Sequence, residues 1–434
     1  MCRGFVLGGG VTGLSAGAAS GLPVFEAEEV PGGICSSYYV RPGETTRLHV
    51  SPRDGEAYRF EMGGGHWIFG GDPAVLQYLR QTAPMGTYAR RSGVWFADEK
   101  LYVPYPLQNH LRYLGADLAA KALEEMSNLT DRRAATMEEW LQGSFGQTLC
   151  EKFFVPFHEL YTAGLYKSIA PQDAYKSPGG LGLAIRGAFS SAPAVGYNIK
   201  FLYPQEGLDA LTRRMAERCT IKYGCEVVAI DVRAKAVHFK DGSELGYENL
   251  LCTLPLNKTL QMAGLSVDEP NAPYTSVLVL NIGGIRGSEC PDDHWLYHPR
   301  TRAGFHRVGF YSNVDRSFLP RSSQERGDRV SIYVEKAFPG GCRPEEAEIQ
   351  RYGQAVVEEL RAWGFIESAE VVDPTWIDVA YTWSYPNSNW KQKALRLLED
   401  HGIFMIGRYG RWTFQGIADS IRDGFYAGAS FRNS

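Results

Sequence analysis

The residues best suited to chemistry lie in a glycine-rich turn near the start of the chain. A short apolar stretch, residues 5–7, meets Gly8, Gly10 and Gly13 in a Gly-x-Gly-x-x-Gly pattern, and small residues continue into a predicted helix. The first glycine permits a tight turn, the second lets backbone approach a pyrophosphate, and the third lets helix and strand pack closely. The helix N-terminus offers unpaired N–H groups. Glu26, eighteen residues after Gly8, ends the second predicted strand, where a carboxylate would accept hydrogen bonds from a ribose diol.

A second glycine pair indicates which dinucleotide to expect. A lone Gly-x-Gly-x-x-Gly also occurs in ordinary turns, but here it lies between a strand and a helix and is followed by an acid. Gly32 and Gly33 come soon after Glu26. This extended pattern resembles the FAD fingerprint of the amine oxidase and protoporphyrinogen oxidase type, and NAD-binding proteins usually lack the second pair. We therefore expect FAD.

The composition sets limits on what surrounds this motif. A chain of 434 residues favours two or three domains, and 44% hydrophobic with 22% charged residues is ordinary for a globular protein. A net charge of −4 gives no basic field for nucleic acid, and no apolar run approaches the length of a membrane span. Eight scattered cysteines without a CxxC pair, and a first strand that begins soon after Met1, predict reduced thiols in a cytoplasmic protein.

The order of the predicted elements indicates an α/β protein with a discontinuous cofactor domain. Strand and helix patterns alternate in residues 1–75, 196–262 and 395–434, which we expect to form a Rossmann-like FAD-binding domain. Apolar residues at helical spacing predict an inserted helical domain over residues 76–195, which would bind substrate or nucleotide. Residues 263–394 are rich in strand patterns and predict an antiparallel β-sheet domain for the substrate.

The chain as a whole resembles a specific family, the flavin-dependent UDP-galactopyranose mutases, and the eukaryotic branch more than the bacterial one. The match spans nearly the whole chain, and the order and spacing of its motifs carry it, since none is decisive alone. The motifs, in chain order, are Gly64-Gly65-His66-Trp67-Ile68-Phe69, Val103-Pro104-Tyr105-Pro106-Leu107-Gln108-Asn109, Trp295-Leu296-Tyr297 with Arg307, Phe310-Tyr311-Ser312-Asn313, Ser384-Tyr385-Pro386, and Gly407-Arg408-Tyr409-Gly410-Arg411-Trp412.

The resemblance implies a reaction without net electron transfer. In that family N5 of reduced flavin attacks the anomeric carbon of a nucleotide sugar, expels the nucleotide diphosphate and forms a covalent N5–sugar adduct. The sugar recloses through a different hydroxyl, so pyranose and furanose forms interconvert. This implies an isomerase of carbohydrate biosynthesis that binds FAD, takes its electrons from NAD(P)H or another reductant, and acts on a small nucleotide sugar. A homo-oligomer is compatible with it.

The resemblance also assigns four catalytic residues. His66 lies where the family has a histidine beside the isoalloxazine ring, and one of its ring nitrogens would brace flavin or protein carbonyls. Arg307, Tyr297 and Tyr385 match residues that contact the diphosphate, because guanidinium and phenol donors suit phosphate oxygens. Each residue also has a plainer alternative. His66 could be a loop histidine bonded to backbone and Arg307 a surface arginine, while Tyr297 could belong to the core and Tyr385 to an ordinary turn.

The remaining assignments concern the cofactor and the nucleotide. Arg408 matches an arginine on the FAD pyrophosphate, Asp419 would assist near the flavin or ribityl chain, and the backbone of Val227 would meet adenine. Trp140 matches a tryptophan near the uracil, although it suits a helical core equally well. The expected cofactor-binding residues are Gly8, Gly10, Gly13, Glu26, Gly33, Gly64, Gly65, His66, Val227, Arg408 and Asp419. The expected substrate-binding residues are Tyr105, Gln108, Trp140, Tyr297, Arg307 and Tyr385.

Three positions depart from the family pattern. Val155 stands where an arginine grips the diphosphate, Phe414 where the C-terminal motif has a tyrosine, and Thr136 where an asparagine lies near the uridine. A shielded Arg–phosphate bond contributes roughly 1.5–3 kcal/mol. We therefore expect a substrate other than UDP-galactose. The cations that could replace the lost contacts are His158, Lys167, Lys176, Arg300 and Arg302.

Two other functions stay open. The same FAD fingerprint serves oxidoreductases of the amine oxidase and protoporphyrinogen oxidase type, and Val155 and Phe414 make the pocket less suited to an anion. Against that function stand Arg307, Tyr297 and the motif at residues 104–109, which an oxidase of apolar substrates does not need. The third alternative is an FAD-binding scaffold whose active site has decayed.

Overall fold

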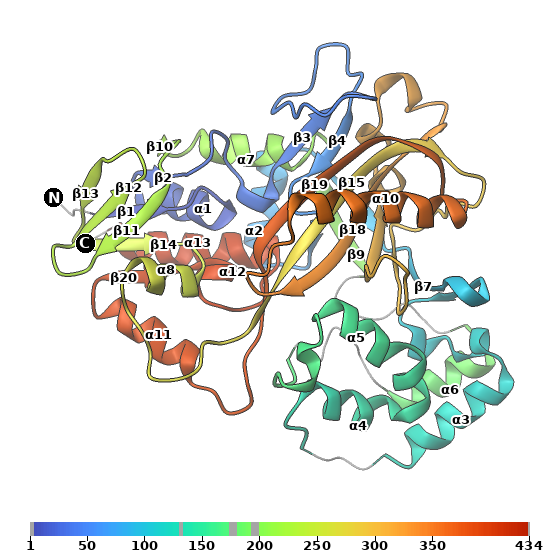
Figure 1. Cartoon of the computed structure of the whole chain (residues 1–434). Coiled ribbons are helices and arrows are strands. Elements are labelled where there is room, and N and C mark those ends of the chain that lie inside the picture. Colours follow the sequence, from blue (N-terminus) through green and yellow to red (C-terminus); the bar gives the residue numbers. More distant parts are fainter. Residues whose placement is uncertain (1–3, 130–132, 173–179, 192–198, 433–434) are drawn as a thin grey trace.

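The computed structural model describes residues 4–129, 133–172, 180–191 and 199–432 and has a mixed α/β architecture. Figure 1 shows three regions: a sheet with flanking helices on the left, a large sheet at the upper right, and a group of helices at the lower right. This arrangement confirms the predicted α/β class, with a Rossmann-like part, a helical part and antiparallel sheet.

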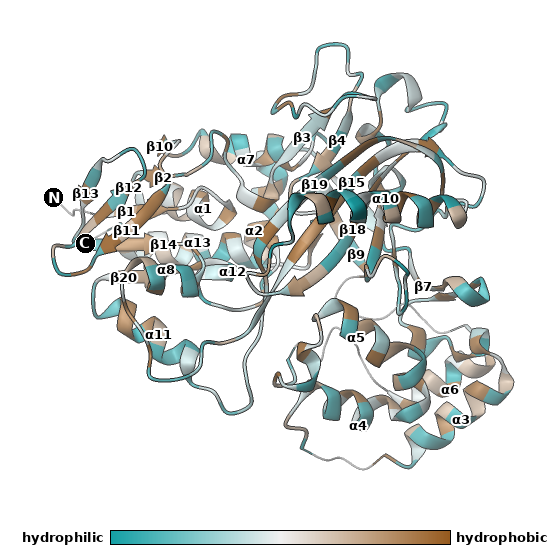
Figure 2. Ribbon diagram, viewed as in Figure 1, coloured by the Kyte–Doolittle hydropathy of each residue, from teal (hydrophilic) through white to brown (hydrophobic). Residues whose placement is uncertain are grey.

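The Rossmann-like part is a five-stranded sheet in which all neighbours pair parallel. Helices α1 (Val11–Ser20) and α13 (Ile417–Phe431) pack together on it, where Gly424 and Gly428 allow α13 to approach the backbone of α1. Parallel strands are buried on both faces and are therefore continuously apolar, as the brown strands in Figure 2 show. The strands, in spatial order, are β10 (Ile221–Lys222), β2 (Val24–Phe25), β1 (Gly4–Leu7), β14 (Asn249–Cys252) and β20 (Ile403–Met405).

The large sheet has seven strands, paired antiparallel except between β16 and β7. Helix α10 (Glu346–Ala362) covers one face through an apolar cluster. Its strands, in spatial order, are β19 (Ile366–Thr382), β15 (Tyr274–Arg286), β18 (Arg329–Pro339), β17 (Arg307–Phe310), β16 (Trp295–Tyr297), β7 (Ser92–Phe96) and β8 (Leu101–Pro104).

The structure differs from the prediction at the start of residues 76–195. Strands β7 and β8 come from that stretch but pair with the large sheet, and Pro104 ends the pairing. The alternating side chains of β7 bury on both faces, since Trp95 packs on the α10 side whereas Val94 and Phe96 pack against the helical part. The stretch also contains 3-10 turns at Leu107–Asn109 and Leu111–Leu114. Its α-helices are α2 (Pro73–Thr82), α3 (Ala116–Ser127), α4 (Met137–Leu149), α5 (Val155–Tyr161) and α6 (Leu181–Phe189).

The remaining strands and α-helices of the described residues are shorter elements. Three short sheets are β3 (Ser37–Val40) with β4 (Tyr58–Glu61), β5 (Ile68–Phe69) with β9 (Lys200–Pro204) and β6 (Met85–Ala89), and β11 (Val227–Asp231) with β12 (Ala236–Phe239) and β13 (Glu244–Gly246). The other α-helices are α7 (Leu208–Ala216), α8 (Leu256–Met262), α9 (Tyr311–Val314), α11 (Trp390–Glu399) and α12 (Gly407–Gly410).

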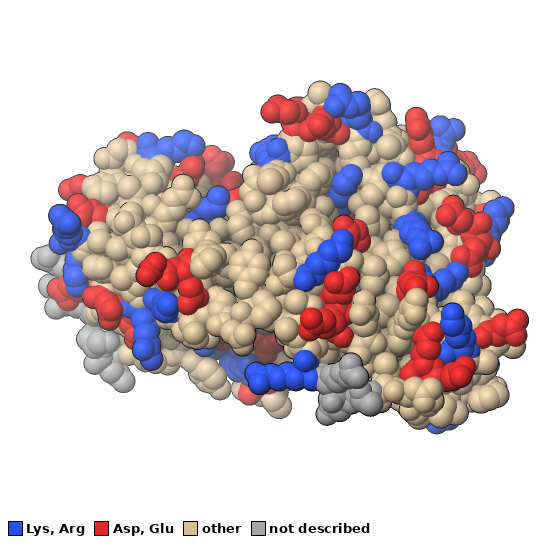
Figure 3. All heavy atoms as spheres, turned by 60° about the horizontal axis from the view of Figure 1, so that its bottom comes forward, with Lys and Arg blue, Asp and Glu red and all other residues tan. Residues whose placement is uncertain are grey.

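Two surface properties bear on partners. Among the described residues no helix combines the length and the apolar character that crossing a membrane requires. On the face shown in Figure 3, acidic and basic side chains are intermingled, so this face presents no extended basic track of the kind that nucleic acid needs.

Candidate active site

A cavity of about 370 Å³ lies where the Rossmann-like part meets the large sheet. Its lining draws on segments far apart in the chain, from the first glycine turn to the start of α13. Glu26 lies at the end formed by the glycine turn, and His66, Arg307 and Tyr381 lie at the end near the large sheet, which we call the ring end. The predicted residues that line the cavity are Gly8, Gly10, Glu26, Gly33, Gly65, His66, Arg307 and Arg408.

The glycine turn has the geometry that its sequence predicts. Gly8 has φ +94°, and a Cβ there would lie 2.1 Å from Thr253 Oγ1. A Cβ on Gly13 would lie 1.9 Å from the carbonyl oxygen of Gly8, so only glycine lets α1 start this close to β1. Gly10 caps α1 without a side-chain hydrogen bond, which leaves the first N–H groups of the helix directed at the cavity.

Glu26 lies at the end of β2, where its carboxylate accepts hydrogen bonds from the backbone N–H groups of Gly9 and of Glu28. Burial raises the pKa of this carboxyl, although the two N–H donors oppose the rise. The donors hold the carboxylate at the rim of the glycine turn, where the sequence predicts a ribose.

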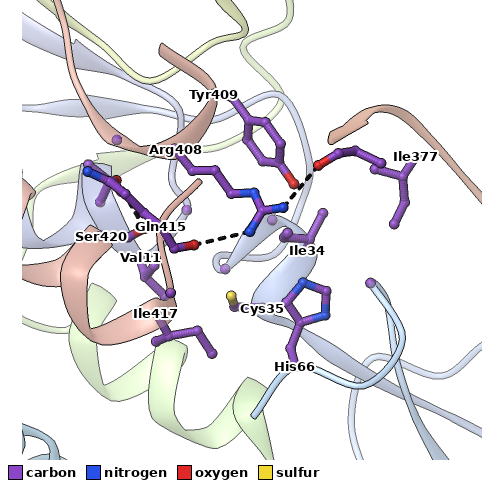
Figure 4. Close-up of a pocket in the computed structure, with 18 of the residues that line it drawn as sticks. Val11, Ile34, Cys35, His66, Ile377, Arg408, Tyr409, Gln415, Ile417 and Ser420 are labelled. Carbon is purple, nitrogen blue, oxygen red and sulfur yellow. Dashed lines mark hydrogen bonds between the residues drawn. The ribbon is translucent and has the colours of Figure 1, made fainter. Parts of the chain in front are cut away.

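A second helix N-terminus reaches the same cavity. Gly416 caps α13 without a side-chain hydrogen bond, and Gly416, Ile417 and Ser420 line the cavity (Figure 4). Asp419, the predicted residue of this helix, is absent from the lining and pairs with Arg422 at 3.2 Å. The polar side chain of α13 that lines the cavity is therefore Ser420, whereas the sequence predicts Asp419 there. One position along a helix turns a side chain by about 100°, and only the packing of α13 decides which residue faces inward.

His66 lies at the other end of the cavity, near Cys35 in Figure 4. Its Nδ1 is 3.2 Å from the carbonyl oxygen of Gly64. Because a carbonyl only accepts, Nδ1 donates and Nε2 keeps its lone pair. Burial, and then the positive charge of Arg408, lower the pKa of His66 to about 4, so the ring is neutral at pH 7.

Arg408 is held above the cavity by backbone carbonyls. Its guanidinium donates to the carbonyl oxygens of Gln415 and Ala380, each at 3.1 Å (Figure 4). The guanidinium carbon lies 4.6 Å from the ring centre of Phe414. The family tyrosine at that position would add a hydroxyl, whereas Phe414 offers only a ring face to the cation.

Arg307 is paired with a buried acid, Glu335, that no motif of the sequence predicts. Its Nη2 donates to both carboxylate oxygens of Glu335, whose side chain is 3% exposed, and lies 3.5 Å from Tyr381 Oη. Burial alone would raise the pKa of Glu335, but Arg307 and His306 outweigh it and hold the pKa at about 2. A glutamate inside the apolar strand β18 was the signal that could have revealed it.

Tyr297 stands beside Arg307 because β16 and β17 pair antiparallel with these two residues in register. Its ring packs against Tyr105, with centroids 4.7 Å apart, and against Phe157 of α5, at 5.5 Å. Two of the predicted substrate residues, Tyr105 and Tyr297, are therefore in contact, and both lie beside the ring end of the cavity rather than in its lining.

Other predicted residues lie elsewhere. Tyr385 is in the turn after β19 and does not line the cavity, whereas Tyr381, four residues earlier, does. Val227 opens β11 outside the lining, close in sequence to Cys225, whose N–H donates to the carbonyl of Glu26 at 2.7 Å. Four other predicted residues also lie outside the lining: Gly13, Gly64, Gln108 and Trp140. Gln108 is buried, and the ring centroid of Trp140 lies 5.7 Å from that of Phe145.

The positions that depart from the family pattern have structural roles. Thr136 is the N-cap of α4 and forms a capping box with Glu139. Val155 begins α5, which sets Phe157 and Tyr161 one turn apart; the Tyr161 ring lies 5.0 Å from that of Tyr381. An aromatic wall thus stands between the helical part and Arg307.

The candidate replacement cations that the structure describes do not line the cavity. His158 is buried, and burial lowers its pKa to about 4, so it is neutral at pH 7. Lys167 pairs with Glu159 at 3.1 Å. Arg300 and Arg302 line a separate groove, and Lys176 lies outside the described residues.

Comparison with known proteins connects this geometry to a family. The family described as flavin containing amine oxidoreductase matches residues 14–280. Reduced UDP-galactopyranose mutase has TM-score 0.84 at 20% identity, covering 99% of this chain and 95% of that chain. Cyclohexylamine oxidase from Brevibacterium oxydans has TM-score 0.65 at 12% identity, covering 100% and 99%. The CLA-producing fatty acid isomerase from P. acnes has TM-score 0.57 at 14% identity, covering 99% and 98%. At these identities the likeness shows the fold.

The residues present fit a bound FAD. Two helix N-termini without side-chain caps, at Gly10 and Gly416, offer backbone donors where a pyrophosphate needs them. Glu26 lies at the end suited to a ribose. Val277 and Ile377 supply an apolar surface at the end suited to a flat ring system, next to the neutral His66.

Proposed function

The chain belongs to the flavin-containing amine oxidoreductases and binds FAD, and on this premise we propose that it is a flavin-dependent sugar mutase. The reaction we propose interconverts the pyranose and furanose forms of a sugar. The substrate is a nucleotide sugar other than UDP-galactose, or a sugar with a different leaving group. The observation that carries the proposal is a cluster of polar side chains at the ring end of the cavity, where Arg307 and Tyr381 line it and Tyr297 lies beside Arg307. The likeness to UDP-galactopyranose mutase over nearly the whole chain supports it.

Arg307 would hold the departing group, with the phenols of Tyr297 and Tyr381 beside it. The chemistry that reduced FAD supplies when bound is a nucleophilic ring nitrogen, N5. Because Glu335 neutralises Arg307, this group set offers hydrogen-bond donors with little net positive charge. A leaving group of lower charge than a nucleoside diphosphate suits such a site better, and the loss of the family arginine at Val155 and tyrosine at Phe414 points the same way.

His66 and the aromatic wall would prepare the site for that chemistry. The Nε2 lone pair of neutral His66 can accept a hydrogen bond from a cofactor N–H or a sugar hydroxyl, while Nδ1 stays fixed on Gly64. Phe157 and Tyr161 would exclude water from the reacting carbon, because their rings pack on Tyr297 and Tyr381.

The test is to reduce the FAD-loaded protein with dithionite under anaerobic conditions and to supply a panel of nucleotide sugars and sugar monophosphates. Ring-contracted product with no net oxidation of the flavin is the expected result. If no member of the panel turns over or perturbs the absorbance of the reduced flavin, the mutase proposal fails.

An oxidoreductase of the amine oxidase type is the second candidate. The aromatic side chains Tyr161 and Trp383, which pack on Tyr381, and Phe157, which packs on Tyr161, support it, because such walls suit apolar substrates. The likeness to cyclohexylamine oxidase supports it as well. Stoichiometric hydrogen peroxide from amines in air would favour this candidate over the mutase.

A further inference from the structure

A second groove lies on the opposite face of the large sheet from the cofactor cavity. It is formed by the β7–β8 hairpin, the connection between β16 and β17, and the C-terminal end of α10, and its volume is about 1300 Å³. Side chains alternate along a strand, so Leu296 of β16 faces the groove whereas its neighbours Trp295 and Tyr297 pack toward the cofactor side. The two sites share no lining residue.

The floor of the groove consists of aromatic rings that are held in place. Trp363 stacks on His298, with ring centroids 4.8 Å apart and 18° between the planes. Trp95 packs against Phe365 at 6.2 Å, and Tyr102 Oη donates to an Asp293 carboxylate oxygen at 2.9 Å. Trp363, Trp95 and Tyr102 are only half-buried, so parts of rigid rings are open to a ligand.

The walls carry charges of both signs. Glu359 is used internally, since its carboxylate accepts from the N–H groups of Arg302 and Ala303, both at 2.9 Å, and so anchors the β16–β17 connection. Among the described residues, the other charged side chains of the groove make no ion pair within 4.0 Å. These side chains are Lys100, Arg300, Arg302, Arg361, Asp98, Glu289 and Glu358.

We propose that this groove binds a neutral oligosaccharide. A polyanion or a basic peptide would meet nearly as many repelling as attracting charges, whereas sugar hydroxyls both donate and accept and can use carboxylates and guanidinium groups alike. The apolar C–H face of a sugar ring packs on an aromatic plane such as the indole of Trp363. The volume exceeds the roughly 300–1,000 Å³ of a pocket for one small ligand, which favours several sugar units over one.

This inference goes beyond the proposed function and does not depend on it, because the groove contains no residue of the cofactor cavity. The experiment is calorimetric titration of the full, FAD-loaded chain with maltohexaose, cellohexaose, chitohexaose and a galactan hexasaccharide. At least one is expected to bind with a dissociation constant of about 1 mM or lower, and the matching monosaccharide at least about tenfold more weakly.

Two variants place the binding in the groove. Trp363→Ala and Arg300→Ala are each expected to weaken binding by about tenfold or more. Tyr426→Ala is the matched control, since this exposed aromatic residue lies outside the groove, and it should change nothing. Arg300 is exposed, so its variant keeps the test valid if Trp363→Ala fails to fold, as judged by FAD content. Absence of binding by all four hexasaccharides, unchanged binding in Arg300→Ala, or tighter binding of a sulfated hexasaccharide would overturn the proposal.

Discussion

Replacing Arg307 with methionine should leave the buried carboxylate of Glu335 without its positively charged partner. The Glu335 side chain is 3% exposed, and its pKa lies at about 2 instead of 4.5. That difference of about 2.5 corresponds to about 3 kcal/mol at 1.36 kcal/mol for each pKa unit. Because the folded-state pKa is lowered, this stabilisation is complete above about pH 4.5 and is lost as the pH falls toward 2. At pH 7 we expect Arg307→Met to lower the free energy of unfolding by about 3–5 kcal/mol, the cost of breaking a buried pair.

The assay is urea denaturation at pH 7 of the wild type and three variants. Arg41→Met, which breaks the exposed pair with Asp54, is the control and should cost about 0–1 kcal/mol. The double variant Arg307→Met with Glu335→Gln should recover at least half of the loss, because it removes the stranded charge. An Arg307→Met variant as stable as Arg41→Met, or a double variant as unstable as Arg307→Met, would refute the reasoning.

Three further predictions concern the cofactor and the substrate. Gly13→Ala should yield protein with little bound FAD, because its Cβ collides with the backbone carbonyl of Gly8. Gly182→Ala, at an open position in α6, is the control and should keep the flavin absorbance. Equal flavin absorbance of the two purified variants would contradict this prediction. His66 should stay neutral in NMR titrations above about pH 5, with protonation near pH 4. Since the unfolded ring titrates near 6.5, the His66 contribution to stability is present above that pH and is lost as the pH falls toward 4; a midpoint near 6.5 would sink the idea. Phe414→Tyr adds one donor and should tighten UDP binding, measured by flavin fluorescence, by about two- to tenfold; unchanged binding would count against a phosphate site beside Arg408.

The parts of the site that depend on neighbouring residues could be predicted from the sequence. The glycine turn needs only the local geometry of one strand and one helix, so the positions of Gly8, Gly10 and Glu26 follow from spacing. The pairing of Tyr297 with Arg307 joins two consecutive strands, which are antiparallel neighbours and are linked by residues 298–306.

The rest depends on packing that spacing does not encode. Ser420 rather than Asp419, and Tyr381 rather than Tyr385, reach the cavity because the rotation of α13 and the end of β19 are set by contacts with distant segments. Glu335 could not be paired with Arg307 in advance, because 28 positions separate them and only the register of β17 with β18 brings them together.

The contact between α1 and α13 has a consequence for how the flavin is acquired. One helix N-terminus of the site, that of α1, is synthesised long before the other, that of α13, whose Gly424 and Gly428 pack on the backbone of α1. A nascent polypeptide that still lacks α13 therefore offers only one of the two helix N-termini that would bind the pyrophosphate. Capture of the coenzyme therefore has to wait until α13 has docked on α1, and the yield of folded protein should follow the supply of flavin in the cell.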